Sequence, residues 1–343
     1  MLICSLLFAA FAGAANAVLL ASDSDNTTAP ADDPGWARFG TRTGTNDSGV
    51  AQHGLTLIYV GNGWVLTANH VGVTDLKLTG EVYPRVPGSG VQLQNPDGSS
   101  ADLLAYRISG NPGLPALGVL EFASASPAID TAVTMIGRGA NRGAATTWNQ
   151  PPLRSGWFWT GTASMHWGTN LISDTVGEEE LGTAALVMDF TKPGEASFTP
   201  DEAQAVTGDS GGGVWVKNGG SWELAGVLFA ASQHDGQAPH ASFDGNLSIA
   251  ADLALFRPQL IALVRPECSD EVDNDGDGLT DYPDDPGCSS LEDDSEVPPV
   301  PSASLHGTAV LALLFMGGGF AWLRQHRPGA RLGALLFRDR LRR

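Results

Sequence analysis

The segment Thr207-Gly208-Asp209-Ser210-Gly211-Gly212-Gly213 sets one serine in a run of glycines, directly before the apolar residues Val214-Trp215-Val216. Glycines around a serine let backbone N–H groups turn toward one point, because no Cβ obstructs them. Such N–H groups can hold a developing oxyanion, so the segment predicts a nucleophilic serine. A serine hydroxyl is a weak nucleophile at neutral pH and needs a base within hydrogen-bond reach.

An earlier segment supplies that base and runs Gly61-Asn62-Gly63-Trp64-Val65-Leu66-Thr67-Ala68-Asn69-His70-Val71. Asn62-Gly63 predicts a hairpin turn, and the apolar run after it predicts a strand that ends near His70. Histidine suits the role because its unperturbed pKa is about 6.5. Each motif alone is common in turns and strand ends, but the two together indicate Ser-His catalysis.

These motifs resemble the T-A-x-H and G-D-S-G-G marks of the trypsin/chymotrypsin-like (S1-type) serine proteases, over roughly residues 36–266. The resemblance implies an all-β fold of two antiparallel six-stranded β-barrels with a short C-terminal helix. It also implies a serine-type endopeptidase that works through an acyl-enzyme without a cofactor. The backbone N–H groups of Gly208 and Ser210 would form the oxyanion hole.

The third catalytic residue has to be a carboxylate that orients the imidazole. Asp102 is the leading candidate, because Asp102-Leu103-Leu104-Ala105 resembles the D-[IVL]-x-L segment that lies between the other two motifs in the family. Asp75, close to His70, and Asp130, in front of an apolar run, are the competing candidates.

The sequence departs from the family pattern in three respects. Gly213 stands where proline is usual, and residues 36–266 contain no cysteine. No I-V-G-G-like activation sequence precedes the first barrel. In the animal enzymes a new N-terminal ammonium pairs with the residue that corresponds to Asp209. We therefore expect Asp209 to have another partner here, and no zymogen cleavage.

The resemblance places the primary substrate pocket at four residues: Gln204, Phe229, Ala230 and Ala231. Gln204 stands six residues before Ser210, where trypsin-like specificity requires aspartate. This favours a neutral, shallow pocket, unless a shifted loop brings Asp201 or Glu202 into it.

Composition agrees with many short strands joined by tight turns, since the 343 residues include 43 Gly and 21 Pro. Strands are expected at 55–60, 64–68, 103–108, 132–136, 185–190, 213–217 and 222–230. Leucines and isoleucine at helical spacing predict one helix over 253–264, with Pro258 in its first turn or at a kink. The net charge of −19 argues against nucleic acid as a partner.

The N-terminus has the pattern of an export signal over residues 1–17. An apolar run, Leu2–Phe11, leads to Ala15-Asn16-Ala17, an A-x-A cleavage pattern, although no Lys or Arg precedes the run. Residues 18–35 are expected to form a flexible lead-in. Cleavage would remove Cys4 and leave Cys268 and Cys288, which predict a disulfide in an exported protein.

Residues 267–296 are acidic and predict a calcium-binding module. Its carboxylates fall at loop positions one, three, five, nine and twelve, with glycine at six: Asp273, Asp275, Asp277, Asp281 and Asp284. This spacing suits Ca²⁺ and resembles thrombospondin type 3 and dockerin repeats. A calcium-stiffened spacer is the expected role, and a solvated acidic linker is the alternative.

The C-terminal segments predict attachment to a membrane. A Pro-rich linker (297–306) leads into an apolar stretch (307–323), followed by an arginine-rich cytoplasmic tail (324–343). As a helix the stretch would span roughly 26 Å, marginally enough for a bilayer. The arrangement resembles bacterial sorting signals of the PEP-CTERM class. A permanent anchor and a tail cleaved by a sorting protease both remain open, and a buried core helix is the third reading.

Together these features predict an exported serine endopeptidase that acts on proteins or peptides in the periplasm, at the cell surface or outside the cell. Two alternatives remain: a non-catalytic surface adhesin on a protease scaffold, and an esterase with the same catalytic residues.

Overall fold

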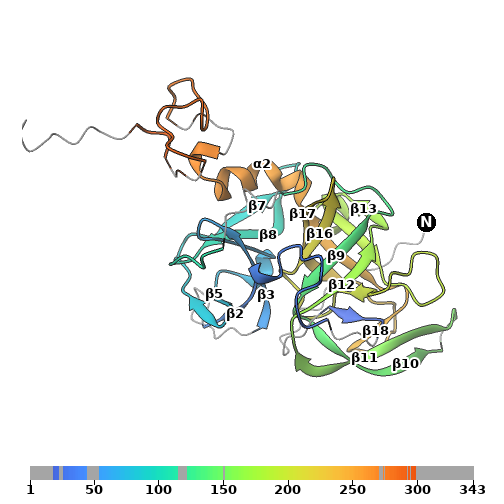
Figure 1. Cartoon of the computed structure of the whole chain (residues 1–343). Helices are drawn as coiled ribbons and strands as arrows, with labels where there is room; N and C mark the ends of the chain where they lie inside the picture. Colours follow the sequence, from blue (N-terminus) through green and yellow to red (C-terminus); the bar gives the residue numbers. More distant parts are fainter. Residues whose placement is uncertain are drawn as a thin grey trace, which may run out of the picture. The chain divides into compact units, whose positions relative to one another are not determined.

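The computed structural model of the chain describes residues 18–22, 26–44, 54–114, 122–149, 151–269, 273, 275–291, 293 and 295–298. The described chain is mostly β-structure with few helices (Figure 1). None of its helices has the length and apolar character needed to cross a membrane. The predicted export signal, the apolar stretch 307–323 and the arginine-rich tail lie outside the described residues.

The first half of the chain forms a seven-stranded antiparallel sheet of order β6-β5-β2-β3-β4-β8-β7. Its strands are β2 (Phe39–Thr43), β3 (Gly54–Gly61), β4 (Trp64–Thr67), β5 (Asp75–Leu78), β6 (Glu81–Tyr83), β7 (Val91–Gln94) and β8 (Ser100–Arg107). The predicted Asn62-Gly63 turn joins β3 to β4, and both residues have the positive φ that such turns require.

A second seven-stranded sheet has the order β12-β9-β16-β17-β19-β14-β13. Its strands are β9 (Ala132–Gly137), β12 (His166–Leu171), β13 (Asp174–Val176), β14 (Ala185–Asp189), β16 (Gly213–Asn218), β17 (Ser221–Ala231) and β19 (Leu247–Asp252). Two smaller sheets accompany it. One joins β10 (Ala140–Trp148), β11 (Arg154–Ala163) and β18 (Ala241–Phe243), and the other joins β1 (Leu19–Leu20) and β15 (Ala203–Gln204).

All seven strands expected from the sequence are present. The prediction was an all-β fold, and the structure confirms a chain that is mostly β with few helices. The expected six strands per unit differ from the seven found in each main sheet. Edge strands β6 and β13 have only three residues each, and some of these are polar. They are too short to show the alternation of apolar and polar residues that predicts a strand. Closure of the two sheets into barrels stays a prediction.

The predicted helix is α2 (Leu253–Val264), which packs against β17 and β7 (Figure 1). Asp252 caps it by accepting a hydrogen bond from the Ala254 N–H at 3.2 Å. Pro258 lies at the sixth helical position, beyond the first turn. A short helix, α1 (Glu178–Leu181), precedes β14 and was not foreseen.

The expected flexible lead-in begins with ordered structure instead. Val18–Ala21 is buried, and Leu19 and Leu20 pair with Gln204 and Ala203 of β15. Burial of four consecutive apolar side chains lowers the free energy of the folded chain, so this segment packs against the protein and is not flexible.

Candidate active site

His70 lies in a 3₁₀ turn, Asn69–Val71, that follows β4. Val65 and Leu66 of β4 are buried in the first sheet's core, while the turn brings the imidazole to the surface. The His70 side chain is 45% exposed, so a substrate can reach it.

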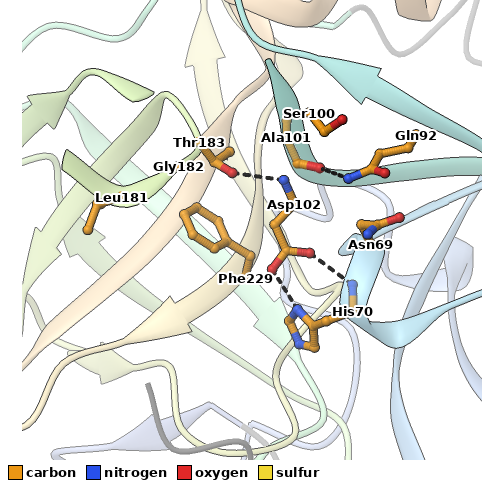
Figure 2. Close-up of a pocket in the computed structure, with 10 residues that line it drawn as sticks. All are labelled: Asn69, His70, Gln92, Ser100, Ala101, Asp102, Leu181, Gly182, Thr183 and Phe229. Carbon is orange, nitrogen blue, oxygen red and sulfur yellow. Dashed lines mark hydrogen bonds and ion pairs between the residues drawn. The ribbon is translucent and has the colours of Figure 1, made fainter. Parts of the chain in front are cut away.

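Asp102 contacts His70 at two points from β8, the strand paired with β4. Its Oδ1 accepts a hydrogen bond from the His70 backbone N–H at 2.9 Å, and its Oδ2 lies 2.7 Å from Nδ1. The backbone N–H of Asp102 donates to the Thr183 hydroxyl at 2.8 Å (Figure 2). The carboxylate is thereby fixed at the position that holds Nδ1 protonated and leaves Nε2 free to accept a proton.

Ser210 comes from the turn before β16, in the second half of the chain, and its Oγ lies 2.7 Å from His70 Nε2. Its carbonyl oxygen accepts a hydrogen bond from the Thr56 N–H of β3 at 3.0 Å. The structure therefore brings Ser210, His70 and Asp102, the three leading candidates from the sequence, into one hydrogen-bonded row.

The turn around Ser210 also presents two unused donors. Neither the Gly208 N–H nor the Ser210 N–H donates a hydrogen bond to any described residue. Gly208 has φ +104°, a conformation that glycine adopts without strain. Two unpaired donors beside a serine hydroxyl are what an oxyanion hole requires.

The competing carboxylates lie elsewhere. Asp75 accepts hydrogen bonds from the backbone N–H and the guanidinium of Arg85, each at 3.1 Å. Asp130 has φ +65° in a turn before β9. In the described structure neither contacts His70, whereas Asp102 does so twice.

A cavity of about 330 Å³ opens beside this row (Figure 2). Its lining comes from both halves of the chain: Asn69, His70, Gln92, Ser100, Ala101, Asp102, Leu181, Gly182, Thr183 and Phe229. Sequence reasoning missed the contributions of β7 and of α1 with the two residues after it, because nothing in those segments marks them as neighbours of the histidine.

Of the four expected pocket residues, Phe229 lines this cavity. Gln204 is buried, and its backbone pairs with Leu19. Ala230 is half-buried and Ala231 is exposed. Glu202 does not enter the cavity, since its buried carboxylate accepts the Thr191 and Thr199 N–H groups, and desolvation raises its pKa.

The acidic module is closed by the predicted disulfide between Cys268 and Cys288, whose Cα atoms are 5.6 Å apart. The carboxylates of Asp273, Asp275 and Asp277 converge within 4.8 Å of one another. Gly276 and Gly278 donate their N–H groups to Asp273. Asp281 is half-buried, and Asp284 is exposed.

No protein-family model matches the chain, and no curated protein matches it. Among solved structures, neuropsin, a serine protease expressed in the limbic system of mouse brain, matches with TM-score 0.40 and 15% identity over 61% of this chain and 88% of neuropsin. The Rv3671c protease from M. tuberculosis, in its active form, matches with TM-score 0.39 and 14% identity over 71% and 92%. Both neighbours are serine proteases, and both are too distant to assign an activity to this chain.

Proposed function

We propose that the protein is a serine endopeptidase. The observation that carries the proposal is the row from Ser210 Oγ through both ring nitrogens of His70 to Asp102, with two spacings of 2.7 Å. The unpaired N–H groups of Gly208 and Ser210 lie at the serine end of that row.

The reaction begins when Ser210 Oγ attacks the substrate carbonyl carbon while its proton passes to His70 Nε2. The carbonyl oxygen gains negative charge and accepts hydrogen bonds from the Gly208 and Ser210 N–H groups. Each such donor is worth roughly 10²–10³ in rate. His70 returns the proton to the leaving amine, and an acyl-enzyme remains. Water, deprotonated by His70, then releases the acid and restores Ser210.

The Asp102 carboxylate stabilises the imidazolium that forms in each half of the reaction. The exposed histidine and the open cavity beside it fit an extended peptide. Leu181 of the four-residue helix α1 and the following Gly182 and Thr183 line the same cavity as His70 (Figure 2).

A serine-directed phosphonate tests the proposal on the full chain with its disulfide intact. We expect wild type to be labelled on Ser210 and to cleave denatured proteins, and Ser210→Ala to do neither. Folded wild type that resists labelling would indicate a binding scaffold. Labelling with ester hydrolysis but no peptide cleavage would indicate an esterase.

Export and membrane attachment are part of the same proposal and rest on the sequence. The Ala15-Asn16-Ala17 pattern and the apolar stretch 307–323 support a protease held outside the cytoplasm, with the acidic module as a spacer. Fractionation of cells that produce the full chain tests this. Recovery in the cytoplasm with residue 1 intact would contradict it.

A further inference from the structure

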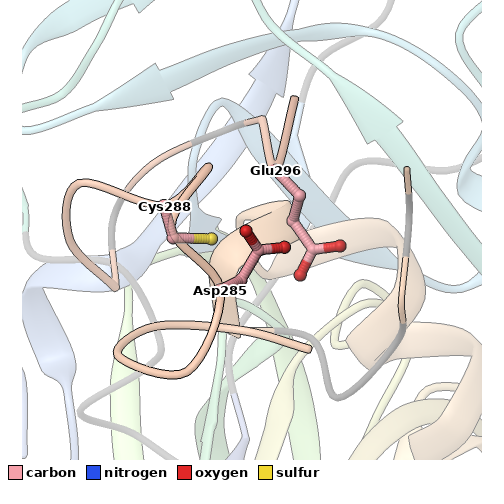
Figure 3. A group of neighbouring side chains, drawn as sticks. All are labelled: Asp285, Cys288 and Glu296. Carbon is pink, nitrogen blue, oxygen red and sulfur yellow. The ribbon is translucent and has the colours of Figure 1, made fainter. Parts of the chain in front are cut away.

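Two buried carboxylates lie together in the acidic module. Asp285 is 1% exposed and Glu296 is 0% exposed. Their oxygens lie within 4.8 Å of each other and of the Cys288 sulfur (Figure 3). The sulfur is bonded to Cys268 and is not available as a metal ligand. Two negative charges at this distance and away from water repel strongly unless a cation or a proton lies between them.

The hydrogen bonds of the pair leave one oxygen without a partner. Asp285 Oδ1 accepts the Gly287 N–H, and Glu296 Oε1 accepts the Asp281 N–H at 2.8 Å. Asp285 Oδ2 is buried and has no hydrogen-bond partner among the described residues. A buried, unpaired carboxylate oxygen is costly, so it points to a ligand that it would bind.

The charge of the same carboxylate acts on the converging aspartates of the loop. The pKa of Asp275 is raised by desolvation and by the carboxylates of Asp277, Asp285 and Asp273. Asp284, which the loop spacing assigned to the last ligand position, is exposed. The five carboxylates form two groups, Asp273, Asp275 and Asp277 in the loop and the buried pair of Asp285 and Glu296. Together they offer the many hard oxygen ligands that Ca²⁺ prefers.

We infer that Asp285 and Glu296 complete a calcium site with Asp273, Asp275 and Asp277, and that Asp284 is not a ligand. Glu296 lies beyond Cys288, so the ion would tie the end of the module to the disulfide-closed loop. The site would stiffen the spacer and take no part in peptide cleavage.

The neighbours Asp284 and Asp285 allow a matched test on the full, disulfide-bonded chain. Calcium titration by calorimetry, and luminescence of Tb³⁺ sensitised by the module's own Tyr282, measure binding. We expect Asp284→Asn to bind within about twofold of wild type, and Asp285→Asn and Glu296→Gln at least about tenfold more weakly.

Thermal unfolding of the module gives a second readout that a merely misfolded variant would not reproduce. In EDTA, Asp285→Asn should be at least as stable as wild type, because it removes one of two repelling charges. In calcium it should be less stable, because it lacks a ligand. Wild type that binds neither ion, or Asp284→Asn that loses binding while Asp285→Asn keeps it, would overturn the inference.

Discussion

Asp102 holds His70 by both of its carboxylate oxygens, one on the backbone N–H at 2.9 Å and one on ring Nδ1 at 2.7 Å. The backbone contact fixes where the residue lies, and the ring contact fixes which way the imidazole faces. A single contact would leave the ring free to rotate about its side-chain bonds. Two contacts direct Nε2 at the Ser210 hydroxyl before substrate arrives.

The double contact predicts that Asp102→Asn lowers kcat by about 10⁴ with little loss of folded protein. The amide can still accept the His70 backbone N–H, but it no longer stabilises the imidazolium or selects the tautomer. Steady-state kinetics of peptide hydrolysis measure the loss of kcat. Asp75→Asn, which alters a carboxylate bound to Arg85, should change kcat less than about threefold. A larger loss of kcat in Asp75→Asn than in Asp102→Asn would indicate that Asp75 is the catalytic carboxylate.

Thr183 is predicted to act as a positioning residue through Asp102. Its hydroxyl accepts the Asp102 N–H at 2.8 Å, so Thr183→Val removes the acceptor at nearly constant volume. We expect kcat to fall about fivefold and KM to change little, since one hydrogen bond is worth about 1 kcal/mol. Thr183→Ser should restore kcat. A loss shared equally by the serine variant would indicate packing instead of the hydrogen bond.

The sequence located the parts of this site that short motifs encode. Ser210 and His70 sit in local patterns whose chemistry depends on adjacent residues, and Asp102 begins a recognisable strand. The cavity wall could not be predicted in the same way. Gln92 and Leu181 contribute to it only because separate segments meet at the site, and neither carries a local signature.

Burial explains the remaining differences between expectation and structure. Composition marked residues 18–35 as flexible, but the four apolar residues at its start are buried against β15. Loop spacing marked Asp284 as the last calcium ligand, whereas the adjacent Asp285 is the buried residue. Spacing cannot decide which of two neighbouring carboxylates faces inward, because that depends on the disulfide and on Glu296.

Asp252 gives a prediction about stability and pH. It is buried at the start of α2, and desolvation raises its pKa despite hydrogen bonds from Ser126 and the Ala254 N–H. Asparagine caps helices equally well and carries no charge. At pH 7 we therefore expect Asp252→Asn to be more stable than wild type by roughly 1 kcal/mol.

The sign of the pH dependence follows from the raised pKa. Asp252 of the folded wild type binds a proton at a higher pH than Asp252 of the unfolded chain. The loss of stability caused by the buried charge is therefore complete above the pKa of Asp252 in the folded state. The stability difference between Asp252→Asn and wild type should vanish as pH falls toward about 3.9, the ordinary pKa of an aspartate in an unfolded chain. Urea unfolding of both proteins from pH 7 to 4 measures the difference. Asp97→Asn is an opposite control, because hydrogen bonds from Ser99 lower the pKa of Asp97 and make its charge favourable.

The close approach of the Ser210 turn to β3 gives the last prediction. Gly211 has φ +83°, and a Cβ there would overlap the Thr56 carbonyl oxygen and the Thr67 hydroxyl. Gly211→Ala should therefore unfold at lower temperature and lose at least about 10² in kcat/KM, because the Thr56–Ser210 contact has to move. Gly220 also has positive φ, +96°, but nothing lies within 4 Å of its missing side chain. Gly220→Ala should incur only the backbone strain of about 1 kcal/mol and keep full activity. Equal loss of activity in the two variants would show that the packing of the Ser210 turn against β3 does not position the nucleophile.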